Sequence, residues 1–160
     1  MNSHDESEVS ESGHGAITTT VYWLLHIGLG GLILATGVGK ALDLPGFIGV
    51  LQTYRLGLSH ELLWTTGLAV TAFELGLGLW ILGGRRLERA MGLAIALNLG
   101  YFLLMTLSLW RSLQLHNCGC YGVFFARPLR WYSPLEDLLL VALSWLLLRM
   151  AVRRQAAPAG

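Results

Sequence analysis

Charged residues are scarce in this sequence. Asp, Glu, Lys and Arg together make up 13% of the 160 residues, whereas a soluble domain usually carries about 25%. The formal net charge of +1 gives no electrostatic basis for binding nucleic acid. Because 54% of the residues are also hydrophobic, the composition indicates an integral membrane protein in a lipid bilayer rather than a soluble domain.

The first 16 residues contain no lysine and no arginine. A secretory signal peptide begins with a basic region, so this acidic segment does not resemble one. We expect residues 1–16 to form a short disordered acidic tail and residues 17–152 to form one membrane domain. Residues 153–160 would then be a basic C-terminal tail.

The apolar residues are concentrated in four blocks, each long enough to cross a bilayer of roughly 30 Å as a helix of about 20 residues. These blocks are Thr18–Ala41, Glu61–Leu82, Ala90–Trp110 and Leu135–Val152. The pattern predicts an all-α fold, an integral membrane bundle of four transmembrane helices. Two of the blocks contain small residues at a spacing of four, which allows close helix contact. They are Gly31, Ala35 and Gly39 in the first block and Gly92, Ala96 and Gly100 in the third.

A shorter amphipathic segment lies between the first two blocks. Phe47, Val50, Leu51 and Tyr54 follow the i, i+3, i+4, i+7 spacing of a helix with one apolar face. The segment is too short to span a bilayer, so we predict a short interfacial helix between helices 1 and 2.

Basic residues are divided almost evenly between the two ends of the predicted bundle. One end holds Arg85, Arg86, Arg89, Arg149, Arg153 and Arg154, and the other holds Lys40, Arg55, Arg111, Arg127 and Arg130. Lysine and arginine accumulate in cytoplasmic loops. The first set is clustered next to helix ends, which favours an inner-membrane protein with both termini cytoplasmic. The loop after the third block would then face the periplasm.

Three polar residues interrupt the apolar blocks at a similar depth. At about 1.5 Å per residue, His26, Glu74 and Asn98 each lie roughly 12 Å from the cytoplasmic edge. We expect them to form an intramembrane polar layer. The layer would be either a hydrogen-bonded set that fixes helix packing or a proton path or ligand site.

A second group of charges is expected at the outer mouth, namely Lys40, Arg111 and Asp137. The depth estimate places Lys40 too far from Glu74 for a simple pair. It favours the acids Asp43, Glu136 and Asp137 as partners of Lys40 instead.

The only two cysteines, Cys118 and Cys120, flank Gly119 in the last loop. A compact turn at glycine can bring two Cα atoms within disulfide range, and a strained disulfide is readily exchanged. His116 and Arg111 nearby would stabilise a thiolate. We therefore favour a redox-active pair with His116 as proton acceptor. The alternatives are a structural staple or idle thiols, and a soft metal ion bound by His116 and the two thiolates.

Several stretches carry a resemblance to one family. They are Gly37–Lys40, Asp43–Phe47, Tyr54–Leu56, Glu74–Leu79 and Asn117–Gly122. In these the chain resembles the methylamine-utilisation protein MauE family, within the DoxX-like group of four-helix membrane proteins. The resemblance implies a bacterial inner-membrane protein that helps to mature a disulfide-rich subunit beside a thioredoxin-like periplasmic partner. It also implies that Cys118 and Cys120 are the redox pair.

The predicted function is therefore membrane thiol–disulfide exchange, the chemistry of a disulfide oxidoreductase. The chain has no second cysteine pair, so Cys118 and Cys120 would have to contact both the partner and any quinone acceptor. A quinone pocket would be formed by the aromatic residues Trp110, Phe124, Phe125, Trp131 and Tyr132. Two other functions compete with exchange. One is a non-catalytic membrane subunit of a larger respiratory or energy-transducing complex, and the other is a metal or small-solute carrier.

Overall fold

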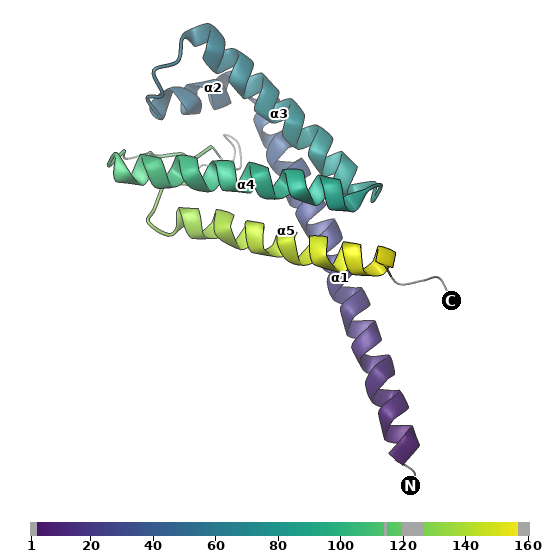
Figure 1. Cartoon of the computed structure of the whole chain (residues 1–160). Helices are drawn as coiled ribbons and strands as arrows, with labels where there is room; N and C mark the ends of the chain where they lie inside the picture. Colours follow the sequence, from purple (N-terminus) through teal and green to yellow (C-terminus); the bar gives the residue numbers. More distant parts are fainter. Residues whose placement is uncertain (1–2, 114, 120–126, 157–160) are drawn as a thin grey trace.

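The computed structural model describes residues 3–113, 115–119 and 127–156 (Figure 1). The helices are α1 (Ser3–Leu42), α2 (Leu44–Thr53), α3 (His60–Leu82), α4 (Leu87–Trp110) and α5 (Ser133–Ala156). No β-strand occurs among these residues, which confirms the predicted all-α class. Helix α1 begins at Ser3, whereas the sequence suggested a helix from about residue 17. The division into a tail, a membrane domain and a basic end stays a prediction.

Three of the helices are long and apolar enough to cross a membrane: Ile17–Leu42 within α1, α3 and α4. Helix α5 has a similar length of 24 residues but contains Glu136, Asp137 and Arg149, with Arg153 and Arg154 at its end. Its apolar stretch is confined to residues 138–148. The fourth predicted span is therefore not confirmed, nor is a position of α2 at a membrane surface.

Local sequence explains where the short elements begin. The Asp43 side chain accepts a hydrogen bond from the Gly46 amide at 2.9 Å, so it caps α2 at its N-terminus. Pro45 lies in the first turn of α2. Proline has no backbone N–H to donate, and a first-turn N–H would have no acceptor within the helix, so the proline costs no hydrogen bond there. Between α3 and α4, Gly84 and Arg86 adopt positive φ angles of 67° and 49°. These left-handed residues turn the chain between the end of α3 at Leu82 and the start of α4 at Leu87.

The long helices pack as two pairs, α1 with α3 and α4 with α5, as Figure 1 shows. One apolar core joins both pairs, and its buried residues are Leu29, Ile33, Leu77, Ile81, Leu87, Ala90, Met91, Ala94, Leu147 and Ala151. A smaller core of Phe47, Ile48, Leu51 and Leu63 fixes α2 against α3. Large apolar side chains also lie exposed along the helices, for example Leu24, Leu79 and Leu103, which is consistent with a lipid bilayer around the bundle.

The close contact between α1 and α3 depends on glycines that the spacing rule did not select. A Cβ atom on Gly78 would lie 2.6 Å from the backbone nitrogen of Leu34, and one on Gly37 would lie 2.9 Å from that of Leu75. By contrast, a Cβ on Gly31, Gly92 or Gly100 would meet nothing within 4 Å. Gly92, Ala96 and Gly100 all lie exposed. The prediction that Gly92, Ala96 and Gly100 form close helix contacts is therefore wrong within this chain.

Candidate functional site

The cysteine loop is closed at its base by backbone hydrogen bonds. The Cys118 amide donates to the Arg127 carbonyl at 2.9 Å, and the Leu129 amide donates to the Leu115 carbonyl at 2.9 Å. These bonds hold Cys118 beside the segment that leads into α5. Cys120, with Tyr121, Phe124 and Phe125, lies outside the described residues. A Cys118–Cys120 disulfide therefore stays a prediction.

Tyr54 anchors Cys118 to the C-terminal end of α2. Its hydroxyl donates a hydrogen bond of 2.5 Å to the Cys118 carbonyl oxygen, and only 1% of the tyrosine is exposed. Arg111 at the end of α4 binds the backbone of the segment that contains Tyr54. Its guanidinium donates to the carbonyl oxygens of Tyr54 at 3.1 Å and Arg55 at 3.0 Å. Arg111 therefore supports the tyrosine that holds Cys118, and its role as a stabiliser of the thiolate stays a prediction.

Gly119 is required by the backbone beside the thiol. Its φ angle is +72°, a conformation that side chains disfavour. A Cβ there would lie 2.9 Å from Cγ1 of Val50 on α2. The Gly119 amide also donates to the side-chain oxygen of Asn117 at 2.9 Å. The glycine thus allows the loop to lie directly on α2, which the sequence analysis expected only as a means of bringing two cysteines together.

Cys118 lines an internal cavity of about 50 Å³ between the loop and the helices. Its polar lining residues are Thr36, Glu74, Asn98, Tyr101, Cys118, Arg127, Ser133, Glu136 and Asp137, and its apolar ones include Leu32, Ile33, Leu97, Met105 and Leu140. A cavity holds a water molecule if it offers roughly 10–15 Å³ of such volume and polar partners. The cavity therefore has room for a few water molecules.

Asp137 is the unsatisfied acid of this cavity. It is 6% exposed, and within the described part of the chain its Oδ2 atom has no hydrogen-bond partner. It precedes the apolar stretch of α5 and lies outside the three helices long and apolar enough to span. Burial raises the pKa of Asp137 to about 7, and the negative charges of Cys118 and Glu136 contribute to this rise. The neighbouring Glu136 instead forms an exposed ion pair with Arg127 at 2.9 Å.

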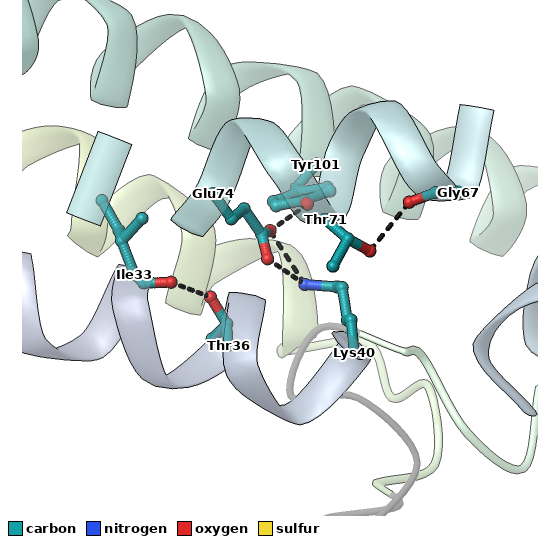
Figure 2. Close-up of polar contacts among 7 residues, drawn as sticks. All are labelled: Ile33, Thr36, Lys40, Gly67, Thr71, Glu74 and Tyr101. Atoms are coloured by element: carbon teal, nitrogen blue, oxygen red, sulfur yellow. Dashed lines mark hydrogen bonds and ion pairs between the residues drawn. The ribbon is translucent and has the colours of Figure 1, made fainter. Parts of the chain in front are cut away.

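Lys40 and Glu74 form a buried ion pair (Figure 2), and Glu74 also lines the cavity. The Lys40 Nζ atom lies 2.8 and 2.6 Å from the two carboxylate oxygens, and each residue is 1% exposed. The Tyr101 hydroxyl also donates to Glu74. The Lys40 ammonium lies 5.5 Å from the ring centroids of Phe47 and Tyr101, within reach of a cation–π interaction.

This ion pair corrects the depth estimate, which separated Lys40 from Glu74. Because Gly78 faces Leu34 and Gly37 faces Leu75, the register of the antiparallel helices brings Lys40 opposite Glu74. Helix α3 begins well beyond the end of α1, whereas the estimate assumed that their ends were level. The acids proposed as partners of Lys40 have other roles, since Asp43 caps α2 and Glu136 binds Arg127.

The three residues of the predicted polar layer do not lie together. Glu74 and Asn98 line the same cavity, and Asn98 donates to the Ala94 carbonyl of its own helix at 2.8 Å. His26 lies near the other end of α3, where its Nε2 atom contacts the Ile81 carbonyl at 2.6 Å. Ile81 is seven residues from Glu74, or about 10 Å along the helix. His26 therefore belongs to the packing of the opposite end.

His116 is placed away from the cavity. It is exposed and lines an outer groove with Leu113, Leu115, Pro128 and Leu129. Its role as the proton acceptor stays a prediction, whereas three acids, Glu74, Glu136 and Asp137, line the cavity together with Cys118. No group of three His, Cys, Asp or Glu side chains in the described ranges is arranged to hold a metal ion.

Three of the aromatic residues proposed for a quinone, Trp110, Trp131 and Tyr132, belong to the described part of the chain. Trp110 is 84% exposed and Trp131 is 77% exposed, while Tyr132 stacks edge-on against Trp131. None of these three lines the Cys118 cavity. The cavity of about 50 Å³ fits water molecules, and a quinone pocket stays a prediction.

Two tyrosines were missed as parts of the site. The sequence marks Tyr54 as a member of an amphipathic pattern and of one stretch of the family resemblance, and it does not single out Tyr101. A tyrosine in an apolar segment carries a hydroxyl that needs a partner, and this rule would have marked both residues. It would not have identified Cys118 and Glu74 as the partners, because each contact crosses between elements distant in sequence.

The fold and the site together define a small multi-pass helical membrane protein that holds a cysteine against a cavity with both polar and apolar lining residues. The chain belongs to the family described as Methylamine utilisation protein MauE, which matches residues 18–150. This match confirms the resemblance noted from the sequence. No curated protein and no solved structure matches the chain.

Proposed function

We propose that this MauE-family membrane protein carries out thiol–disulfide exchange, with Cys118 and Cys120 cycling between dithiol and disulfide against a thioredoxin-like protein. The observation that carries the proposal is the position of Cys118. Its carbonyl and amide are held by Tyr54 and Arg127, and the residue lines a cavity that also contains the buried carboxyl of Asp137. A carboxylate in the same cavity can take up the thiol proton as the thiolate forms, and the thiolate is the nucleophile in disulfide exchange.

The proposal includes a location for the exchange. The loop, α2 and the first turns of α5 gather at one end of the bundle, whereas Arg85, Arg86, Arg153 and Arg154 belong to segments at the other end. The arginine cluster favours a cytoplasmic position for that end. The cysteine loop would then face the periplasm of a bacterial inner membrane, where a disulfide can persist.

Trapping of a mixed disulfide tests this function. A Cys120→Ser chain retains only the Cys118 thiol and a Cys118→Ser chain retains only the Cys120 thiol, so an exchange intermediate cannot be resolved within the chain. We expect at least one variant to accumulate a higher-mass species on a non-reducing gel that reductant removes and that mass spectrometry identifies as a protein with its own cysteine pair. The Cys118→Ser/Cys120→Ser chain is the matched control. If neither single variant traps a partner and both retain full function, the proposal fails.

A further inference from the structure

We propose that Asp137 is the proton acceptor of the Cys118 thiol and that the two groups share one proton across the cavity. This inference rests on the proposed exchange function and deepens it. It replaces His116, which lies in an outer groove, by an acid that the sequence analysis had placed only among the charges of the outer mouth.

The geometry of the cavity supports the assignment. Cys118 and Asp137 belong to different segments, the loop and α5, and both line the same cavity. Asp137 is more than nine-tenths buried, and its Oδ2 atom has no hydrogen-bond partner among the described residues. A buried carboxyl oxygen without a partner is costly, so its retention here points to a role that uses the free oxygen. Water molecules that fit the cavity can connect it to the thiol.

The other charged groups around Asp137 are already neutralised by partners. Glu136 on the same helix pairs with Arg127 of the loop. Glu74 of α3 pairs with Lys40 of α1 and accepts a hydrogen bond from Tyr101 of α4. Cys118 therefore remains the titratable neighbour that can exchange a proton with Asp137 across the cavity. Since burial raises the pKa of Asp137 to about 7, the carboxyl is matched to proton transfer near neutral pH.

The step conserves charge and electrons. The S–H bond of Cys118 breaks, its proton passes to the Asp137 carboxylate, and the negative charge moves to the sulfur. The Cys118 thiolate then attacks one sulfur of a partner disulfide, which forms a new S–S bond. The leaving sulfur takes the electron pair of the old S–S bond and can be protonated by Asp137.

The pH profile of Cys118 alkylation tests the proposal without any partner protein. The measurement uses the Cys120→Ser chain in lipid nanodiscs, so that iodoacetamide reacts only with Cys118. In this parent the Asp137 carboxylate opposes thiolate formation. The additional change Asp137→Asn removes that charge, and we expect the pKa of Cys118 to fall by roughly one unit or more. Below this pKa the variant would react about tenfold faster than the parent, and above it the two rates would converge.

Glu136→Gln in the same parent is the matched control, since it removes an adjacent but exposed carboxylate. We expect a clearly smaller shift because solvent screens exposed charges. Equal shifts in both variants, or no shift in Asp137→Asn, would overturn the proposal. A general loosening of the loop would instead raise the rate at every pH, including above the pKa, and would also count against it.

A second measurement does not use the Asp137→Asn variant, so it tests the proposal even where that variant fails to fold. In the Cys120→Ser parent, ¹³C-labelled aspartate carboxyls are titrated before and after Cys118 is blocked with neutral iodoacetamide. We expect blocking to lower the pKa of Asp137, because the sulfur can no longer become negative. An unchanged titration would contradict the shared proton. The trapping experiment can fail while this coupling holds, so the two proposals are tested separately.

Discussion

At the scale of single residues, a buried ion pair joins two helices inside the apolar interior of the bundle. Lys40 and Glu74 are each 1% exposed and lie within 2.6 Å of one another. Removing one member of such a pair leaves the other charge buried without compensation, whereas removing both does not. Tyr101 and the nearby aromatic rings add contacts to this pair. The pair therefore ties the end of α1 to the middle of α3 and to α4.

We expect Glu74→Gln to lower the free energy of unfolding by about 3–5 kcal/mol. The double change Lys40→Met/Glu74→Gln should cost clearly less than the sum of the two single changes. The exposed ion pair offers a control, because Glu136→Gln at the Arg127 contact should cost at most about 1 kcal/mol. Unfolding of these chains in detergent, followed by circular dichroism, measures the differences. Additive costs for Lys40 and Glu74 would show that the two charges do not interact.

At the scale of helices, the contact between α1 and α3 is set by the absence of side chains at a few positions. Gly78 lies directly against the backbone of Leu34, whereas a Cβ atom on Gly76 of the same helix would meet nothing within 4 Å. Close backbone approach is a common device for association of membrane helices. The same contact sets the register of the two helices and therefore places Lys40 beside Glu74.

Gly78→Ala should separate α1 from α3 and destabilise the protein by about 1–3 kcal/mol, since the added methyl group meets backbone atoms that cannot rotate away. Gly76→Ala is the matched control. It should be neutral or stabilising by up to about 1 kcal/mol, because alanine favours a helix over glycine. The measurement is the thermal unfolding midpoint of each variant, compared with that of the unchanged protein. Equal midpoints would mean that Gly78 does not define the helix contact.

At the scale of the whole molecule, the elements divide into two functional ends. Tyr54 and Arg111 join Cys118, the end of α2 and the end of α4 at one end of the bundle. At the other end Arg154 near the C-terminus of α5 contacts Thr19 at 3.1 Å and the ring of Tyr22, and His26 contacts Ile81. The proposed function puts the partner site in the periplasm and the C-terminus in the cytoplasm. The two ends of the bundle would then face opposite sides of the membrane.

Site-directed labelling tests that orientation. In a chain with Cys118→Ser and Cys120→Ser, the exposed positions His116 and Ala156 are changed separately to cysteine as His116→Cys and Ala156→Cys. We expect a membrane-impermeant maleimide to label the first from outside intact spheroplasts and the second only in inverted vesicles. The reverse pattern would place the cysteine loop in the cytoplasm and would contradict the proposed location.

Several features of this protein were determined by the sequence alone. Long apolar runs form helices because each backbone donor finds its acceptor within the same segment, so the all-α class and most helix ranges followed from composition and spacing. The cysteine motif was likewise visible, together with the family it indicates. Lys40 and Glu74 could also be recognised as unusual residues, since charges in apolar segments are costly.

Only the tertiary structure decided which of these residues act together. The pairing of Lys40 with Glu74 depends on how far α3 extends beyond α1, and the glycine contacts that set this register belong to two helices at once. The presence of Asp137 and Cys118 in one cavity depends on the backbone bonds that join Cys118 to Arg127 and Leu115 to Leu129 ahead of α5. Register and loop closure arise from side-chain packing between distant segments. The spacing of residues within any one segment carries no information about them.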